Sequence, residues 1–378
     1  MKKMYDKTIF LFLFGFFALV WLASSCTHTA EKVAEKGQRT ILPVKYAECF
    51  KIEKDKEKTI LTVNKDGIDK PYGSEEFVLT HKPKDCTDAS CIKIPCEKII
   101  CLSSTQLGYF FSLDNIDNIV AINSSRYLHH KGMREKIKSG EVKRIGKEGH
   151  FNIELIASLA PDVIFVSPFK TGGFDALKNL GIPLVPIAAY NEQTPLGRAE
   201  WIKVLALFTR QEAKADSILN ALEKNYNYLK HLTDTISDRP TVFSGKMRSG
   251  SWYVPGGESF YARYFKDAGA DYIIKDSIQG AYPLSFETIY QKASECDYWR
   301  ILHPEKEDFT MEDLASQDER YRDFKAFKNG NVFFCNMRKK PYHEQVVMKA
   351  DTLLADYIHY FHPNLLPDYK PVFYERLK

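Results

Sequence analysis

The sequence has no strong excess of charge of either sign, and after its first twenty-odd residues it has no long hydrophobic run. Its 53 Lys and Arg residues against 49 Asp and Glu residues give a formal net charge of +4 over 378 residues. So small an excess argues against nucleic acid as the principal partner, because binding to phosphates requires many cations. The lack of further apolar runs excludes a membrane protein with several spans. The apolar share of 44% and the charged share of 27% are those of an ordinary globular protein.

The common signatures of catalysis are also missing. No Gly-x-Ser-x-Gly motif is present, and no Gly-x-Gly-x-x-Gly follows a predicted strand. His343-Glu344 lacks the second histidine that a zincin helix places four residues after the first. We therefore predict that the protein is not an enzyme. An exported hydrolase and a scaffold lipoprotein remain as alternatives from other classes.

The N-terminus has the pattern of a lipoprotein signal. Three lysines precede an uninterrupted run of apolar and small residues over 9–22, which is too short to span a bilayer and is typical of a secretory signal. The run ends in Leu22-Ala23-Ser24-Ser25-Cys26, which resembles a lipobox. We predict a signal peptide over 1–25, lipidation of Cys26 and a polar tether over 26–39. An ordinary cleaved signal is the alternative. The predicted protein is exported and lipid-anchored at the membrane, facing the periplasm.

Export implies an oxidising compartment, in which cysteines can pair. Seven cysteines remain after Cys26, so at least one must stay unpaired. The best disulfide candidates lie close together in the sequence, and three pairings are possible: Cys49, Cys86, Cys91 and Cys96. Their spacing matches no zinc pattern, and we predict no metal site. The other three adjoin apolar runs and are expected in the core: Cys101, Cys296 and Cys335.

The rest of the chain divides by its hydrophobic pattern. Residues 40–97 alternate in short runs separated by turn residues, which predicts a small β appendage. From residue 98 short apolar runs alternate with helical stretches, which favours an α/β fold with mainly parallel sheets covered on both faces. A long segment with helical periodicity separates two such regions. We predict an α/β lobe over 98–195, a long helix over 196–237 and a second lobe over 238–378. A break of the helix near Thr209 is the alternative.

Two helices, one in each half, begin in the same way. Asn152 and Ser285 are good N-cap residues, and a glutamate follows each of them two residues later, Glu154 and Glu287. A carboxylate in the first turn stabilises a helix by about 0.3–1 kcal/mol, so one such glutamate would mean little. Two in matching positions indicate two related lobes, each presenting one acid on the same side.

At these motifs the sequence resembles a known family, the cluster-III solute-binding proteins of ABC importers for ferric siderophores, haem and cobalamin. The resemblance covers residues 98 to about 362. It rests on the long helix and on the motifs at residues 99–104, 152–156, 161–164, 256–260, 267–271 and 284–287. It implies two α/β lobes joined by one long rigid helix, a ligand held between them, and an ABC permease dimer in the inner membrane as partner. It also implies that Glu154 and Glu287 dock onto arginines of that permease.

In such a fold the ligand meets the loops that follow the C-terminal ends of the strands. These loops combine cations with aromatic rings, which suits an anionic iron complex such as a ferric siderophore or haem. Cobalamin is the alternative ligand. The predicted ligand-binding residues are Gln106, Tyr109, Arg126, Tyr127, His129, Lys147, Phe169, Tyr190, Lys246, Arg248, Trp252, Tyr253 and Arg338.

Overall fold

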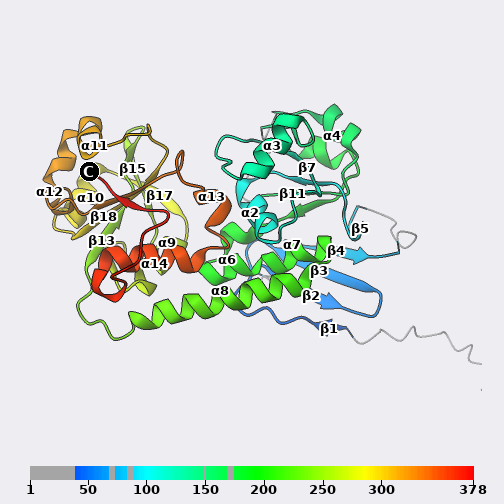
Figure 1. Cartoon of the computed structure of the whole chain (residues 1–378), viewed down its shortest axis with the longest axis horizontal. Coiled ribbons are helices and arrows are strands. Elements are labelled where there is room, and N and C mark those ends of the chain that lie inside the picture. Colours follow the sequence, from blue (N-terminus) through cyan, green and yellow to red (C-terminus); the bar gives the residue numbers. More distant parts are fainter. Residues whose placement is uncertain (1–38, 68–72, 83–88, 148–149, 168–173) are drawn as a thin grey trace, which may run out of the picture. The chain divides into compact units, whose positions relative to one another are not determined.

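The computed structural model describes residues 39–67, 73–82, 89–147, 150–167 and 174–378. The predicted signal peptide, Cys26, the tether up to residue 38, Cys86 and Phe169 lie outside these ranges. Residues from Thr40 to Lys378 form one compact unit (Figure 1).

The predicted β appendage is a five-stranded sheet with the strands in sequence order. Neighbouring strands are antiparallel except for β4 and β5, which are parallel. Asp55 closes the β2–β3 turn by accepting hydrogen bonds from the backbone N–H groups of Glu57 and Lys58. The strands are β1 (Thr40–Ile41), β2 (Phe50–Lys54), β3 (Lys58–Asn64), β4 (Ser74–Thr80) and β5 (Cys91–Lys93).

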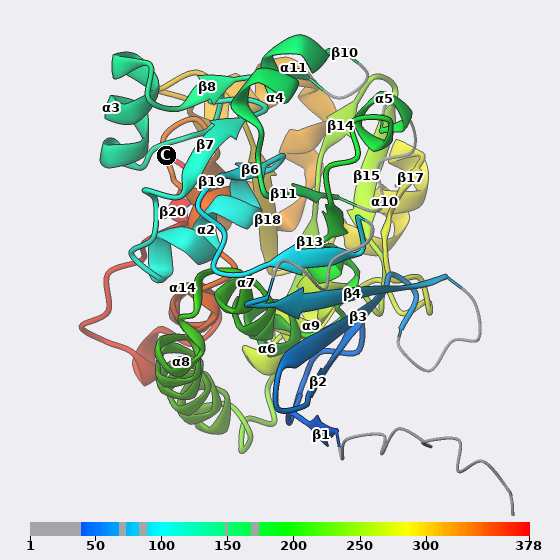
Figure 2. The same ribbon diagram turned by 90° about the vertical axis from the view of Figure 1, so that its right-hand side faces the viewer.

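Two buried glutamates hold this sheet against the helices that follow the first lobe, and Figure 2 shows it beside α6 (Pro195–Glu200) and α7 (Ile202–Thr209). Glu200 is fully buried, and its carboxylate accepts hydrogen bonds from the backbone N–H groups of residues 45, 46 and 47. Glu192 accepts from the N–H groups of residues 48 and 49 and from the Trp201 indole. The chain just before β2 is therefore fixed by two buried carboxylates, of which Glu200 also pairs with Lys203 at 3.1 Å.

Removing the carboxylate of Glu200 should loosen this attachment. Glu200→Ala leaves three partly buried backbone N–H groups without their acceptor, at a cost of about 1 kcal/mol or more for each such group. We expect the free energy of unfolding to fall by about 3 kcal/mol or more and residues 40–60 to become sensitive to protease. Glu212→Ala is the matched control, because Glu212 also contacts the sheet, through a half-exposed ion pair with Lys54. An equal loss in both variants would contradict the proposed attachment.

The first lobe is a parallel sheet in the order β12-β11-β6-β7-β8, with helices on its faces. All residues of β6 and β11 are buried, as expected of strands covered on both faces. Its strands are β6 (Ile99–Cys101), β7 (Ile119–Ile122), β8 (Lys143–Arg144), β11 (Val163–Val166) and β12 (Leu184–Pro186), beside a small hairpin of β9 (Gly146–Lys147) and β10 (His150–Phe151). Its helices are α2 (Ser104–Ser112), α3 (Lys131–Ser139), α4 (Ile153–Leu159) and α5 (Asp175–Lys178).

The second lobe repeats this plan with the order β16-β13-β18-β19-β20, parallel except for the last strand. The main strands are β13 (Thr241–Ser244), β16 (Asp271–Tyr272), β18 (Tyr298–His303), β19 (Val332–Asn336) and β20 (Glu375–Arg376). A second, antiparallel sheet contains β14 (Met247–Arg248), β15 (Ser251–Pro255) and β17 (Ala281–Leu284). The helices are α9 (Phe260–Asp267), α10 (Phe286–Ala293), α11 (Met311–Gln317), α12 (Lys325–Lys328), α13 (Tyr342–Gln345) and α14 (Ala350–Phe361). The predicted α/β class with mainly parallel lobes is confirmed.

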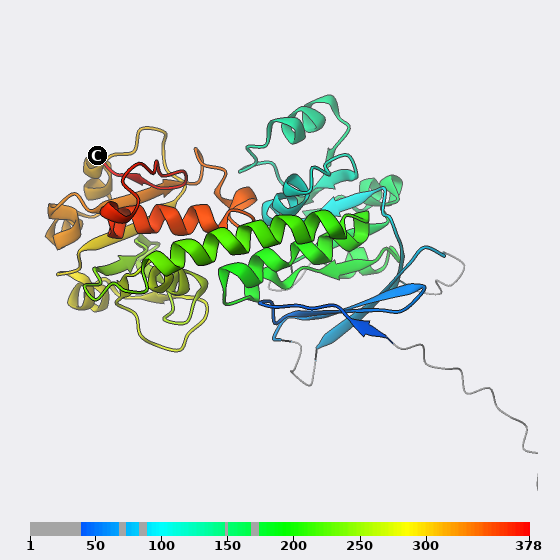
Figure 3. The ribbon, with the colours of Figure 1, turned by 60° about the horizontal axis from the view of Figure 1, so that its bottom comes forward.

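The helix predicted over 196–237 is in fact three helices, α6, α7 and α8 (Glu212–Leu232). Arg210 adopts a left-handed conformation with φ of 57°, which ends α7 and turns the chain, so the alternative of a break near Thr209 is correct. The long helix is α8, whose 21 residues extend for about 30 Å. It runs alongside both lobes with α14 packed against it (Figure 3).

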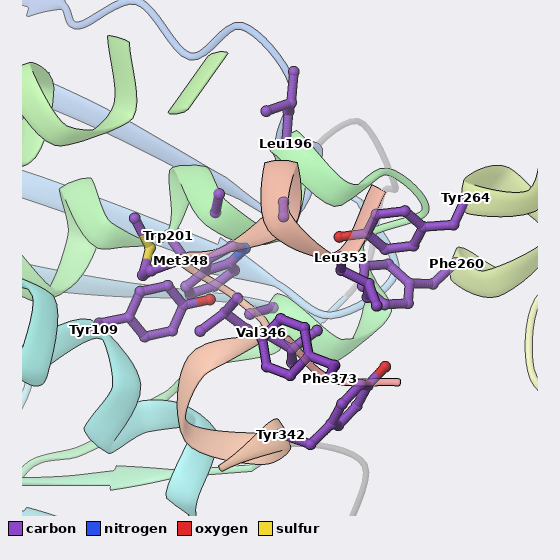
Figure 4. Packing of buried hydrophobic residues seen from close by; sticks show 14 of the residues in the cluster. Tyr109, Leu196, Trp201, Phe260, Tyr264, Tyr342, Val346, Met348, Leu353 and Phe373 are labelled. Atoms are coloured by element: carbon purple, nitrogen blue, oxygen red, sulfur yellow. The ribbon is translucent and has the colours of Figure 1, made fainter. Parts of the chain in front are cut away.

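A continuous buried core joins the two lobes. Figure 4 shows Tyr109 of α2 and Trp201 close to Met348, which follows α13 in the second lobe. The backbones of α2 and α13 approach so closely that a Cβ on Gly108 would lie 2.3 Å from the Glu344 carbonyl oxygen. The lobes are therefore connected by packing as well as by α8.

Candidate functional site

A cavity of about 630 Å³ combines side chains from both lobes, and we call it the cationic cavity. Most of its lining comes from the loop after β7 and from α3 and β8, and Arg338 reaches it from the chain that follows β19. It is lined by Ser125, Arg126, Leu128, His129, Arg134, Ile137, Lys138, Arg144 and Arg338. Three of these residues were predicted from the sequence to bind ligand, and the structure brings them together: Arg126, His129 and Arg338.

The cationic cavity has five positively charged side chains and no carboxylate in its lining. Within the described part of the chain, none of the five has an ion-pair partner within 4 Å. The Arg126 guanidinium lies 5.2 Å from the centre of the Tyr127 ring, a cation–π contact. Cations gathered in this way repel one another, so a bound anion would relieve the repulsion and stabilise the folded protein. The arrangement is suited to a ligand with several negative charges.

The loop that carries Arg126 and His129 is held from both lobes. Glu344 of α13 is 3% exposed, and its Oε2 accepts a hydrogen bond of 2.9 Å from the backbone N–H of His129. Burial raises the pKa of Glu344, while the backbone N–H groups of His129 and His130 oppose that rise. The His130 side chain caps the N-terminus of α3 and stacks on Phe111 with ring centres 4.0 Å apart. These contacts set the position of α3 and of the cations it carries.

A second cavity of about 370 Å³ lies where the N-terminal sheet meets both lobes, and we call it the junction cavity. Tyr190, another predicted ligand residue, lines it and is 53% exposed. Arg198 of α6 lines the same cavity, with its guanidinium 5.2 Å from the centre of the Tyr190 ring.

Several other predicted ligand residues are part of the internal packing. Gln106 caps α2 by accepting hydrogen bonds from the backbone N–H groups of Leu102 and Ser103. Tyr109 is fully buried, and its hydroxyl donates to the carbonyl of Arg198. Trp252 is fully buried and donates to the carbonyl of Ser244. In this conformation the three side chains make hydrogen bonds inside the protein. The structure therefore does not support a direct contact between them and a ligand.

The remaining predicted residues are spread over the surface. Lys147 of β9, Arg248 of β14 and Tyr253 of β15 are exposed, and the cationic and junction cavities do not include them. Tyr127 is half-buried beside His343, with ring centres 6.1 Å apart. Phe169 lies outside the described residues.

Lys246, also predicted to bind ligand, has an internal partner. Its ammonium group pairs with Glu305, and their side chains are only 8% and 14% exposed. Burial tends to raise the pKa of Glu305, but the hydrogen bond and charge of Lys246 outweigh it, so this pKa is lowered. The stabilisation from ionised Glu305 is therefore present above its ordinary pKa of 4.5 and is lost as the pH falls through the lower folded-state pKa.

Lys246→Met should therefore destabilise the protein in a pH-dependent way. It leaves the Glu305 carboxylate without its cation, and we expect the free energy of unfolding to fall by about 3–5 kcal/mol at pH 7. Below pH 4.5 the difference from wild type should shrink, because protonated Glu305 no longer requires a cation. Lys306→Met is the control, since Lys306 is 61% exposed in its pair with Asp313 and should contribute about 1 kcal/mol or less. Denaturant unfolding at several pH values tests this, and a pH-independent difference would contradict it.

Glu154 and Glu287 lie where the sequence predicts, in the first turns of α4 and α10. Asn152 and Ser285 cap these helices by accepting hydrogen bonds from the backbone N–H groups of Leu155 and Thr288. Both glutamates are exposed, and they belong to different lobes (Figure 1). Glu287 makes a loose contact of 3.4 Å with Arg320, which also lies 3.7 Å from the centre of the Phe286 ring. Neither carboxylate is buried in the core.

Three of the five cations of the cationic cavity were not predicted from the sequence: Arg134, Lys138 and Arg144. A signal was available, because Arg134 and Lys138 are four residues apart and lie on one face of α3. Arg144 follows at the end of β8, the strand next to β7. These three residues lie in a helix and a strand, outside the loops that directly follow the strands.

The cysteines correct one expectation. Cys49 and Cys96, two of the disulfide candidates, are free and buried, whereas Cys91 is disulfide-bonded. Cys101, Cys296 and Cys335 are buried and free, as predicted for core residues.

Within the described ranges, no three His, Cys, Asp or Glu residues gather in a way that could hold a metal ion. No described helix combines the length and the apolar character needed to cross a membrane.

Comparison with known proteins shows the family. Residues 99–338 match the family model described as "Periplasmic binding protein", and because this match covers more than half of the chain, the protein belongs to that family of substrate-binding proteins. Two relatives are uncharacterized lipoproteins of Methanocaldococcus jannaschii. One is 27% identical over 294 residues, covering 75% of this chain and 69% of the relative. The other is 26% identical over 317 residues, covering 80% and 79%.

Solved structures share the fold at low sequence identity. A TroA-like periplasmic binding protein, FepB of Veillonella parvula, matches with a TM-score of 0.57 and 16% identity, over 75% of this chain and 95% of that one. The molybdate-binding protein MolA of Haemophilus influenzae matches with a TM-score of 0.58 and 17% identity, over 73% and 89%. The periplasmic haem-binding protein HutB of Vibrio cholerae matches with a TM-score of 0.55 and 16% identity, over 68% and 98%.

Proposed function

We propose that this protein is the substrate-binding lipoprotein of an ABC importer, and that it captures an anionic iron complex between its lobes. The ligand is a ferric siderophore or haem, which the protein delivers to a permease dimer in the inner membrane. Lipidation at Cys26 keeps it at the membrane, facing the periplasm. The observation that carries the proposal is the cationic cavity. Its lining contains five cations, which come from both lobes, and no carboxylate.

The charge of the cationic cavity favours an anionic complex over a neutral one such as cobalamin. A ferric catecholate or a haem with two propionates would bring several negative charges into a space of about 630 Å³. Arginine is well suited to this task, because its planar guanidinium binds carboxylate and phenolate oxygens with two parallel hydrogen bonds. The similar solved structures include proteins named for an iron(III)-hydroxamate transport system and for haem, which agrees with this ligand class.

We assign the docking of the protein onto the permease to Glu154 and Glu287. Both are exposed, both begin a helix, and each belongs to one lobe. Such a pair can contact two subunits of a permease at once, while the ligand remains between the lobes.

Titration of the processed protein with haem, a ferric catecholate, a ferric hydroxamate and cobalamin tests the proposal. We expect a change in visible absorbance and quenched tryptophan fluorescence with at least one anionic iron complex. The affinity should fall as salt is raised, because the contacts of exposed charges are screened. Preference for cobalamin, or equal affinity in low and high salt, would contradict the proposed ligand class.

A further inference from the structure

The junction cavity is built from three parts of the chain that are far apart in sequence. The N-terminal sheet contributes Glu48 and the turn 65–67 after β3, the end of the first lobe contributes Tyr190 and Arg198, and the second lobe contributes residues 259–261 and 279–281. The matched family model begins at residue 99, so one wall of this cavity lies outside it. The cationic cavity shares no lining residue with it.

The wall formed by the sheet is fixed in place. The carboxylates of Glu192 and Glu200 hold the chain before β2, as described above. The Asn191 side chain, which also lines the cavity, donates a hydrogen bond of 2.6 Å to the carbonyl of Lys65. The position of the turn relative to Tyr190 therefore depends on several hydrogen bonds, and the cavity is a built feature of the fold.

Arg198 supplies a cation that the protein does not neutralise. Its Nε and Nη2 donate to the carbonyls of Glu192 and Tyr190, at 3.2 Å and 2.8 Å. Its guanidinium lies 3.5 Å from the centre of the Phe260 ring. Within the described residues no carboxylate forms an ion pair with Arg198, because the Glu192 carboxylate is occupied by backbone N–H groups and by Trp201. The side chain is thus held in one orientation and retains its charge for another group.

A second arginine lies behind the same wall. Arg300 of β18 is 4% exposed, and its guanidinium lies 4.1 Å from the centre of the Tyr261 ring. Its Nη2 is buried and has no hydrogen-bond partner. Phe260 and Tyr261, two neighbouring rings of the cavity wall, are therefore each backed by a guanidinium. Glu48, Lys65 and Asp66 line the side formed by the sheet, so this side offers two carboxylates and one ammonium group opposite Arg198.

We propose that the junction cavity binds a small aromatic carboxylic acid, with the N-terminal sheet as part of the binding site. The carboxylate pairs with Arg198, and the ring lies against Tyr190, Phe260 and Tyr261. Hydroxyl or amino donors on the ring face Glu48 and Asp66. The volume of about 370 Å³ is at the lower end of the range for small-molecule sites, which suits a single substituted ring.

Gly280 allows a sharp test, because it lines the cavity, has no positive φ, and a Cβ added there would meet no atom within 4 Å. Gly280→Trp should fill the cavity without straining the backbone, and Gly280→Ala is the matched control. The probes are 2,3-dihydroxybenzoate and its amide, measured by calorimetry and by saturation-transfer NMR on the whole processed protein. We expect saturable binding of the acid and about tenfold weaker binding of the amide, which lacks the charge for Arg198. Gly280→Trp should abolish binding of the acid, and Gly280→Ala should preserve it.

The sheet's part in the site has its own test. Lys65→Glu places a negative charge at the cavity and should weaken binding of the acid by several-fold, whereas Lys56→Glu, in the other turn of the same sheet, should not. No binding of the acid, equal binding of acid and amide, or binding that survives Gly280→Trp would overturn the proposal. These probes contain no iron, so their result is independent of whether iron complexes bind in the cationic cavity.

Discussion

Replacing Arg126 and Arg338 together with glutamate is expected to weaken the binding of an anionic ferric complex by about a hundredfold or more. The two arginines come from different lobes and line the same cavity, so the double change turns two attractions into two repulsions. Each desolvated charge pair in an interface couples by about 1.5–7 kcal/mol, and every 1.4 kcal/mol is a factor of ten in affinity. Fluorescence titration with haem and with a ferric catecholate measures the effect.

The folded protein should tolerate this double change well. The two arginines are exposed and have no ion-pair partner within the described residues, so the change lowers the repulsion among the cavity's five cations. The matched control is Lys224→Glu with Lys266→Glu, two exposed lysines that the cationic cavity does not include. Both double variants have the same net charge. If they weakened binding equally, the effect would come from overall charge, and the cationic cavity would not be the ligand site.

Replacing both Glu154 and Glu287 with arginine is expected to stop uptake while leaving ligand affinity unchanged. The two side chains are exposed in the first turns of α4 and α10, and neither cavity includes them. Each arginine would place a cation against the arginines expected on the permease and would also oppose the positive end of its own helix. We expect ligand-stimulated ATP hydrolysis by the transporter to fall to its basal level. The free energy of unfolding should fall by about 0.6–2 kcal/mol for the two lost dipole contacts.

Asp216→Arg with Glu295→Arg makes the same change of charge at two other exposed acids and serves as the control. Replacing the permease arginines with glutamate should partly restore transport by the Glu154→Arg, Glu287→Arg protein. Normal ATP hydrolysis with that protein, or an equal loss in the control, would refute the docking role of the two glutamates.

The sequence predicts the central strands well because their burial is visible as apolar runs. The run 163–166 is strand β11, and the runs at 99–102 and 184–187 contain β6 and β12. Such strands are buried on both faces, which leaves no polar residue to obscure the pattern. The break between α7 and α8 is harder to locate. Arg210 takes a left-handed conformation that glycine usually occupies, so its residue type carries no signal for the turn.

The candidate site is less predictable, since cavities depend on how distant elements pack. Arg126 and Arg338 can be nominated from the strands they follow, but only the packing of α3 adds Arg134 and Lys138. Trp252 was nominated because it closely follows a strand. Its ring is nevertheless buried in the core, because β15 directs it inward. The sequence gives no sign that Lys246 is paired, because its partner Glu305 lies 59 residues away along the chain.

The attachment of the N-terminal sheet constrains how this protein and its relatives can diverge. The acceptors are two glutamate side chains, but the donors at residues 45–49 are backbone N–H groups, which every residue except proline has. Substitutions at 45–49 other than proline should therefore be common among relatives with such a sheet, while positions 192 and 200 should remain acidic. In relatives whose chain begins near residue 99, the same two positions have no N–H groups to satisfy and should be free to become apolar.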